Sequence, residues 1–566
     1  MRSRVFAGLL CLALFPVLLL AQPKASEDLI LSTMSQEMNR SLGYLKKQPL
    51  APYFLSYELT DNHAINVSSS FGAITGRSDR RTRLLDIDLR VGSYAMDNSH
   101  AVRGDFAMTT FGQLAGRLPL DDDPKALAVA LWLETDRHYK EAVQRLAAVK
   151  TKNQIKKETE DDSPDFSPAP AEHHFEPIAQ FSFDRASWEQ RLRRYGVLFR
   201  DLPDVQSADI WASGELETRR YINNDGSEIR MSLPLYRLNL SASVKAPDGE
   251  VLPLYRQFMS FTPEGLPDDA QVLKVVGEMK SMLLALRQAP AADAYTGPAI
   301  LSGRASAVFF HEIFGHRVEA DRLKNDDDAQ TFKKKINQPI LPPFLSVYSD
   351  PTLRHLQNSD LVGYYPYDDE GVLAQRVTVI DHGIFRSFLM SRSPINGFPS
   401  SNGHGRRQQG YDVAARQSNL IVESTKSVSR DKLKTLLIER VKAAHRPYGL
   451  LFDDITGGYT FTTRDLPNSF AVLPTVVYRI YPDGREELVR GLDLIGTPLI
   501  AFSKISAADN DVGIFNGICG GESGWVPVSA IAPGLLIDQI EVQRKPKSQA
   551  QDPILPAPGA AQKKEN

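Results

Sequence analysis

Between residues 53 and 96 apolar and polar side chains alternate along the chain, and this pattern most constrains how the chain begins to fold. The alternation is clearest over residues 64–71 and 83–91. Because successive side chains of a strand point to opposite faces, it predicts neighbouring strands with one buried face. Further strand-like stretches meet at Asn-Asp-Gly (224–226) and Pro-Asp-Gly (247–249), which predict hairpin turns.

Two helices are expected beside these strands. Aspartates before Pro124 can cap a helix that begins at this proline and runs to about residue 149. Apolar residues at helical spacing predict a second helix over 269–288, and an Ala- and Pro-rich stretch after it marks a boundary near 290. Residues 150–178 lose periodicity and gain proline and charge, so we expect an exposed loop insertion there.

The rest of the chain reads as a second, mainly β domain over residues 291–544. It has strands, glycine-rich turns and one obvious helical stretch at about 304–322. The tail 545–566, rich in Pro, Ala, Gln and Lys, is expected to be disordered. The fold class is therefore α+β with two domains, a mixed α/β N-terminal domain over 22–290 and a mainly β C-terminal domain.

The N-terminus has the pattern of an export signal. Arg2 and Arg4 precede an apolar run that ends at Ala21, and polar residues follow at once. This pattern predicts a signal peptide over 1–21 and a periplasmic or secreted protein, with an uncleaved membrane anchor as the alternative. Its removal takes away Cys11 and leaves Cys519 as the one cysteine, so no internal disulfide can form.

The charges of the chain exclude one class of partner. Its 566 residues include 66 basic and 69 acidic side chains, a formal net charge of −3. Such a balance lacks the basic excess expected of a nucleic-acid binder. Partners have to be argued from particular sites.

The stretch His311-Glu-Ile-Phe-Gly-His316 is the clearest candidate in the sequence for a metal-binding catalytic site. Zinc peptidases use H-E-x-x-H, in which two imidazoles bind the metal and the glutamate acts as general base. Here the histidines are five residues apart, about 140° around an ideal helix instead of about 40°, so regular geometry cannot aim both at one ion. Gly315 permits a π-bulge or a broken turn that would bring His316 back toward His311.

A third protein ligand would complete such a site, and two residues are candidates. Glu319 lies three residues beyond His316, while Cys519 lies in a glycine-rich stretch that suits a close approach to an ion. A thiolate suits zinc better than calcium or magnesium. Geometry alone leaves both candidates open.

Together with five other short motifs, these residues resemble the TldD/PmbA family of peptidases, specifically its TldD-like catalytic branch. The resemblance implies one Zn²⁺ bound by His311, His316 and Cys519 in a C-terminal metallopeptidase domain carrying an HExxxH helix. It also implies that Glu312 is the general base that activates zinc-bound water to cleave peptides or unfolded segments. We expect a homodimer, or a dimer with a paralogous chain. The other motifs are residues 295–298, 368–371, 381–385, 402–407 and 457–458, and the Cys519 motif spans 519–529.

Two other functions remain open. One is a non-catalytic peptide-binding or scaffold subunit that retains a structural metal, and the other is a zinc hydrolase of a different bond. Structural zinc sites normally close with four protein ligands and need no adjacent base. Three candidate ligands together with Glu312 therefore favour a peptidase.

Overall fold

The computed structural model describes residues 28–100, 115–153, 161–324, 331–460, 462, 470–496 and 498–545. The predicted signal peptide lies outside these residues, as does the predicted disordered tail beyond Lys545. Among the described helices none is long and apolar enough to cross a membrane.

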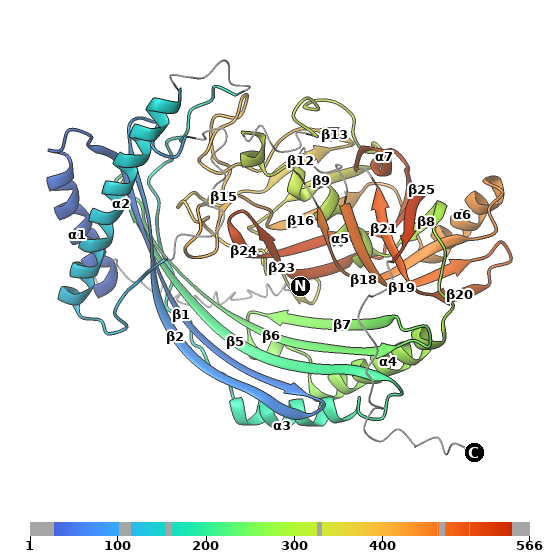
Figure 1. Ribbon diagram of the computed structural model, residues 1–566. Coiled ribbons are helices and arrows are strands. Elements are labelled where there is room, and N and C mark those ends of the chain that lie inside the picture. The colour runs from blue at the N-terminus through green and yellow to red at the C-terminus, as the bar shows by residue number, and fades with distance from the viewer. Residues whose placement is uncertain are drawn as a thin grey trace, which may run out of the picture.

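A long, curved sheet dominates the N-terminal part (Figure 1). Its neighbours follow the order β3-β2-β1-β5-β6-β4, and β7 pairs with β6. All pairings are antiparallel except that of β4 with β6. The predicted strands and both predicted hairpin turns are confirmed. The strands are β1 (Pro52–Ser70), β2 (Ala73–Val91), β3 (Gly116–Arg117), β4 (His173–Phe175), β5 (Val205–Asn223), β6 (Glu228–Lys245) and β7 (Val251–Ser260).

Helices cover the convex face of this sheet (Figure 1). α3 (Arg185–Val197) and α4 (Asp269–Gln288) pack against apolar side chains of β5, β6 and β7. α4 has the predicted bounds, and a capping box formed by Asp268 and Gln271 fixes its start. α1 (Leu29–Leu45) and α2 (Pro124–Asn153) pack at the other end of the sheet. The concave face is thereby left toward the C-terminal part of the chain (Figure 1).

Over 161–178 most residues lie outside helices and strands and are at least partly exposed, but the prediction of an exposed loop over 150–178 is wrong at three places. α2 continues to Asn153, and the segment 173–175 joins the sheet as β4. Phe166 is only 2% exposed because the guanidinium of Arg392 lies 4.0 Å from the centre of its ring. This contact with a residue more than 200 positions later buries a segment whose own composition favours exposure.

The C-terminal part contains two large sheets with α5 (Gly303–Ile313) between them (Figure 1). One sheet has the order β13-β12-β9-β16-β24-β23, and the other has β17-β22-β25-β21-β19-β18-β8, with β20 on β19 and an added β25–β8 pairing. Their strands are β8 (Tyr295–Leu301), β9 (Leu345–Ser349), β12 (Val377–Asp381), β13 (Ile384–Phe385), β16 (Asn419–Ser424), β17 (Ser427–Val428), β18 (Gly449–Thr460), β19 (Phe470–Ile480), β20 (Glu486–Val489), β21 (Leu492–Gly496), β22 (Ile505–Asp509), β23 (Gly513–Gly521), β24 (Gly524–Ala532) and β25 (Leu535–Arg544).

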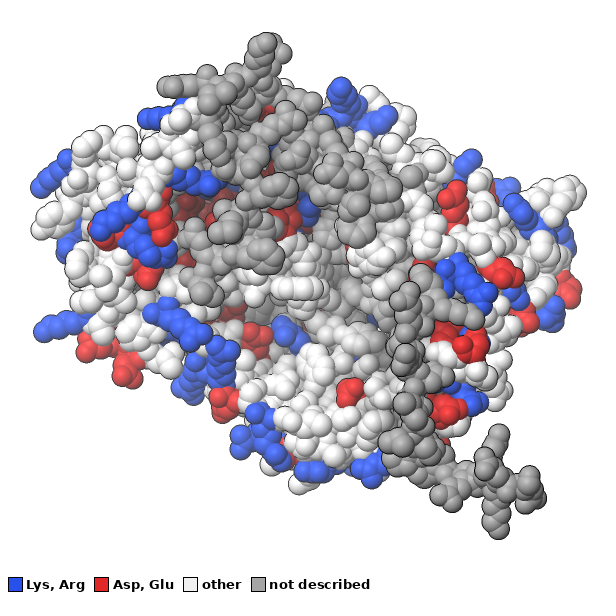
Figure 2. Space-filling model, viewed as in Figure 1, with Lys and Arg blue, Asp and Glu red and all other residues white. Residues whose placement is uncertain are grey.

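Few other elements occur in the described C-terminal residues. They are α6 (Arg430–Ala443), α7 (Pro498–Ser503), the 3-10 turns η4 (Gly315–Arg317) and η5 (Ala320–Leu323), and two small hairpins, β10 (His355–Leu356) with β11 (Ser359–Asp360) and β14 (Gly405–Arg406) with β15 (Ala414–Ala415). The α+β class is confirmed. On the visible face, basic and acidic side chains are interspersed (Figure 2), as expected from the balanced charge.

Candidate metal centre

The candidate site is built around the C-terminal end of α5. Ser302 caps the start of the helix, because its side chain accepts a hydrogen bond from the backbone N–H of Ala305. The apolar residues of the helix are fully buried between the two sheets. His311 and Glu312 lie in its last turn, and the helix ends at Ile313. The prediction of one helix carrying the whole motif is therefore wrong, because His316 lies in η4 beyond the helix end.

The change from α-helix to 3-10 turn brings the two histidines together although they are five residues apart. After Phe314, the tighter turn brings the ring of His316 to 5.0 Å from that of His311, measured between centroids. Gly315 serves here as a point of close approach, since a Cβ at this position would collide with the side chain of Gln417. Of the two alternatives, the structure has the broken turn.

Cys519 reaches the two histidines from β23. Its Sγ lies 3.2 Å from Nε2 of His311 and 3.3 Å from Nε2 of His316. The three potential ligand atoms all lie within 4.8 Å of one another, and all three residues are buried. In β23, Gly521 leaves room for Arg416, whose Cζ would lie 2.8 Å from a Cβ there. The structure thus brings together the three residues that the resemblance implied as metal ligands.

The cluster has the chemistry and the spacing that zinc needs. In a tetrahedral site, Zn–S bonds of about 2.3 Å and Zn–N bonds of about 2.0–2.1 Å place sulfur and nitrogen about 3.5 Å apart. The two observed S···N distances, 3.2 and 3.3 Å, are close to this value. Imidazole nitrogen and thiolate sulfur are ligands that zinc accepts and that calcium and magnesium do not favour.

The charges within the cluster favour the ligand form of the cysteine. Burial by itself would raise the pKa of Cys519, but the two imidazoles lower it well below its usual value. Burial likewise would lower the pKa of His316, yet Cys519 and Glu319 raise it well above the usual value. Since the thiolate is the form that binds metals, the surroundings of Cys519 suit a ligand.

Glu319, the other candidate third ligand, lies behind His316. Its Oε2 is 3.0 Å from Nδ1 of His316, so it orients the ring while leaving Nε2 toward the cluster. The carboxylate is fully buried, and Arg322 donates to the same oxygen at 3.2 Å. Burial would raise the pKa of Glu319, but the imidazole of His316 and the neighbouring arginines hold it far below its usual value. The structure therefore groups Cys519, and not Glu319, with the two histidines.

Arg416 and Gln417 complete the surroundings of the cluster, and sequence reasoning missed both. Nη2 of Arg416 donates to Sγ of Cys519 at 3.3 Å and to its carbonyl at 3.0 Å, while Nε lies 3.4 Å from Oε1 of Glu319. Gln417 donates through Nε2 to the carbonyl of His311 at 3.3 Å. Neither residue lies in a motif that indicates metal binding, so only the folded chain reveals these contacts.

Glu312, the predicted general base, lies at the edge of the same cluster. One carboxylate oxygen is 4.0 Å from Nε2 of His316, and the side chain is almost fully buried. Burial raises the pKa of Glu312 above its ordinary value. Gly458 of β18 packs directly on it, since a Cβ there would lie 2.7 Å from Cγ of Glu312. A glycine at this position is therefore needed for the observed place of the carboxylate.

Comparison with known proteins relates the C-terminal part of the chain to a family of metallopeptidases. Residues 293–544 match the family described as the PmbA/TldA metallopeptidase C-terminal domain. A metalloprotease TldD homolog of Haemophilus influenzae is 28% identical over 330 residues, 56% of this chain and 64% of that protein. A zinc metalloprotease TldD homolog of Saccharolobus solfataricus is 22% identical over 343 residues, 60% of this chain and 72% of that protein. The match to another metalloprotease, from Archaeoglobus fulgidus, spans only 51% of that protein.

The fold has a counterpart among solved structures. TldE from Thermococcus kodakarensis superposes with a TM-score of 0.59, covering 90% of this chain and 100% of that one, at 14% sequence identity. An identity this low establishes the fold alone.

Proposed function

The chain belongs to the TldD/PmbA family, and from this we propose that it is a zinc-dependent peptidase that cleaves peptides or unfolded segments. The observation that carries the proposal is the convergence of His311, His316 and Cys519, with the carboxylate of Glu312 beside them. Relatives named metalloprotease and zinc metalloprotease support it.

In the proposed reaction, the residues of the cluster bind the metal, orient its ligands and transfer a proton. His311 and His316 through Nε2, and Cys519 through Sγ, hold the metal, while Glu319 fixes the ring of His316. Zinc bound there supplies Lewis-acid activation of water and of the scissile carbonyl. Glu312 accepts a proton from the attacking water at its carboxylate and returns it to the departing amine. Burial of the cluster excludes bulk water and strengthens these interactions.

Cleavage by the metal-loaded protein tests this proposal. We expect the wild-type chain to cleave an unfolded polypeptide and Glu312→Gln to retain zinc while losing about 10²- to 10⁴-fold in rate, because the amide cannot take up the proton. Metal content measured on the same samples separates loss of the base from loss of the metal. Wild-type protein that binds zinc but cleaves no peptide would point to the scaffold alternative.

Export and assembly are proposed on separate grounds. The charged and apolar pattern of residues 1–21 supports export, and fractionation of cells that produce the full chain tests it. A dimer, of two copies or with a paralogous chain, follows from the family resemblance alone. Light scattering on the purified chain, alone and with such a paralogue, measures the mass of the assembly.

A further inference from the structure

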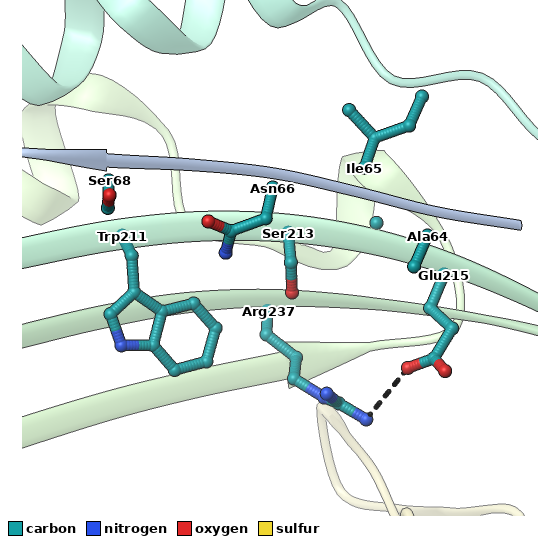
Figure 3. A pocket seen from close by; sticks show the side chains of 9 residues that line it. Ala64, Ile65, Asn66, Ser68, Trp211, Ser213, Glu215 and Arg237 are labelled. Atoms are coloured by element: carbon teal, nitrogen blue, oxygen red, sulfur yellow. Dashed lines mark ion pairs between the residues drawn. The ribbon is translucent and has the colours of Figure 1, made fainter. Parts of the chain in front are cut away.

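A second feature of the molecule lies on the concave face of the N-terminal sheet. A cavity of about 360 Å³ is lined there by residues of β1, β5 and β6 (Figure 3). Trp211, Ser213 and Glu215 are alternate residues of β5 and so project to one side, with Arg237 directly opposite Ser213 in the register. Intervening residues such as Ala212 pack into the core under α3 and α4. The cavity therefore opens on the side that faces the C-terminal domain.

Two polar atoms of residues that line this cavity, and a third atom beside it, are buried without a hydrogen-bond partner among the described residues. They are Oγ of Ser213, Nε of Arg237 and Oδ1 of Asn239. Asn239 lies directly opposite Trp211 in the register and is 4% exposed. Because buried polar groups in folded proteins are as a rule hydrogen-bonded, these atoms indicate a ligand that both donates and accepts.

The charges at the cavity decide which kind of ligand fits. Nη2 of Arg237 lies 3.3 Å from Oε2 of Glu215, and Glu215 also accepts a hydrogen bond from Asn62 at 2.5 Å. Since Glu215 offsets the charge of Arg237, a free anion gains little here. A peptide backbone is uncharged, and it offers C=O to Nε of Arg237 and either N–H or C=O to the hydroxyl of Ser213. The indole of Trp211 adds a flat apolar wall for a side chain of the same segment.

The cavity lies close to the strand that carries Cys519. Leu235 and Met259, which pair in the register with Glu215 and Arg237, pack on Val362 of the C-terminal domain. The backbone N–H of Val362 in turn donates to Oδ1 of Asn516 at 3.5 Å, and Asn516 is three residues before Cys519 in β23. The part of the sheet next to the cavity thus contacts the C-terminal part of the chain at a residue that is hydrogen-bonded to β23.

We propose that this cavity binds an extended segment of the polypeptide substrate, away from the bond that is cleaved. The proposal rests on the proposed function, and it adds that the protein holds long, unfolded substrates at two places. Short peptides reach only the metal centre.

Kinetics with substrates of two lengths test the proposal. Trp211→Ala and Ser213→Leu, the first removing the apolar wall and the second filling the cavity, are compared on an unfolded polypeptide and on a short peptide with the same cleaved sequence. We expect KM for the long substrate to rise about tenfold in both variants, with the short peptide unaffected. Asp209→Asn is the matched control, because Asp209 is exposed on the same face of β5, two residues from Trp211. Equal effects on both substrates, or no effect on either, would overturn the proposal.

Cross-linking separates this proposal from the proposed function. A long peptide carrying a photoreactive side chain is bound to metal-loaded Glu312→Gln, which cannot cut it, and the attached residues are identified by mass spectrometry. We expect labelling on β1 and β5 at the cavity, lost in Ser213→Leu. Labelling confined to the C-terminal domain would overturn the second site while leaving the peptidase intact. Labelling at the cavity by a wild-type chain that cleaves nothing would instead overturn only the proposed function.

Discussion

At the scale of single residues, Arg416 connects the proposed metal ligand Cys519 with the residue behind His316. It is fully buried and links Cys519 to Glu319, which itself orients His316. Arg416→Lys keeps the charge but loses the planar fork that reaches both partners at once. We expect zinc affinity to fall roughly 10- to 100-fold, as for other residues that orient metal ligands. Competition with a chelator measures it, and the equally buried Arg392, replaced by lysine, is the control. Unchanged affinity in Arg416→Lys would contradict the assigned role.

The residues of the site differ in how far the sequence reveals them. His311, Glu312 and His316 stand in a recognisable motif, whereas Cys519 follows from the family resemblance and its glycine-rich surroundings. Arg416 and Gln417 carry no local signal, because their role comes from packing against residues about 100 positions away in the chain. Such contacts depend on the register between strands and loops, which a single sequence does not specify.

At the scale of elements, β18 positions the carboxylate of Glu312, the proposed general base, through a glycine. In Gly458→Ala, the new Cβ would lie 2.7 Å from Cγ of Glu312 and 2.9 Å from the carbonyl oxygen of Ala471, so the carboxylate has to move. We expect kcat/KM to fall about 10- to 100-fold with zinc content unchanged, since small misplacements of a catalytic group are costly. Gly457→Ala is the matched control, because nothing lies within 4 Å of a Cβ there. Equal activity of the two variants would show that Gly458 has no such role.

Elements with strong local signals were predicted well, and those fixed by distant contacts were not. α4 and the β5–β6 and β6–β7 hairpins follow from capping residues and turn sequences. The predicted helical stretch of about 304–322 is longer than α5, which ends at Ile313, because the apolar pattern continues past this end. The broken turn at Gly315 was one of the two predicted alternatives, and the close packing of Gly315 on Gln417 accompanies it. β4 was missed because its pairing with β6 is a tertiary contact.

At the scale of the whole molecule, buried carboxylates where the two parts meet make stability depend on pH. Burial, reinforced by Asp368, raises the pKa of Glu370 to about 8 from 4.5. Between these two pKa values the folded chain holds a proton that the unfolded chain releases. The free energy of unfolding therefore falls as the pH rises from about 4.5 to about 8. We expect Glu370→Gln to lose less Tm than the wild type between about pH 5 and about pH 8. Glu278→Gln, an exposed carboxylate of α4, is the control. A drop in Tm that is equal in Glu370→Gln and the wild type would contradict this account.

We propose that one zinc ion joins residues from two distant parts of the chain, His311 and His316 at the end of α5 and Cys519 in β23. X-ray absorption at the zinc edge on the purified chain tests it most directly. We expect one sulfur at about 2.3 Å from the zinc, together with nitrogen or oxygen neighbours at about 2.0–2.1 Å. The sulfur signal should vanish in Cys519→Ala. A wild-type chain that binds zinc with no sulfur neighbour, or that binds none, would contradict the account.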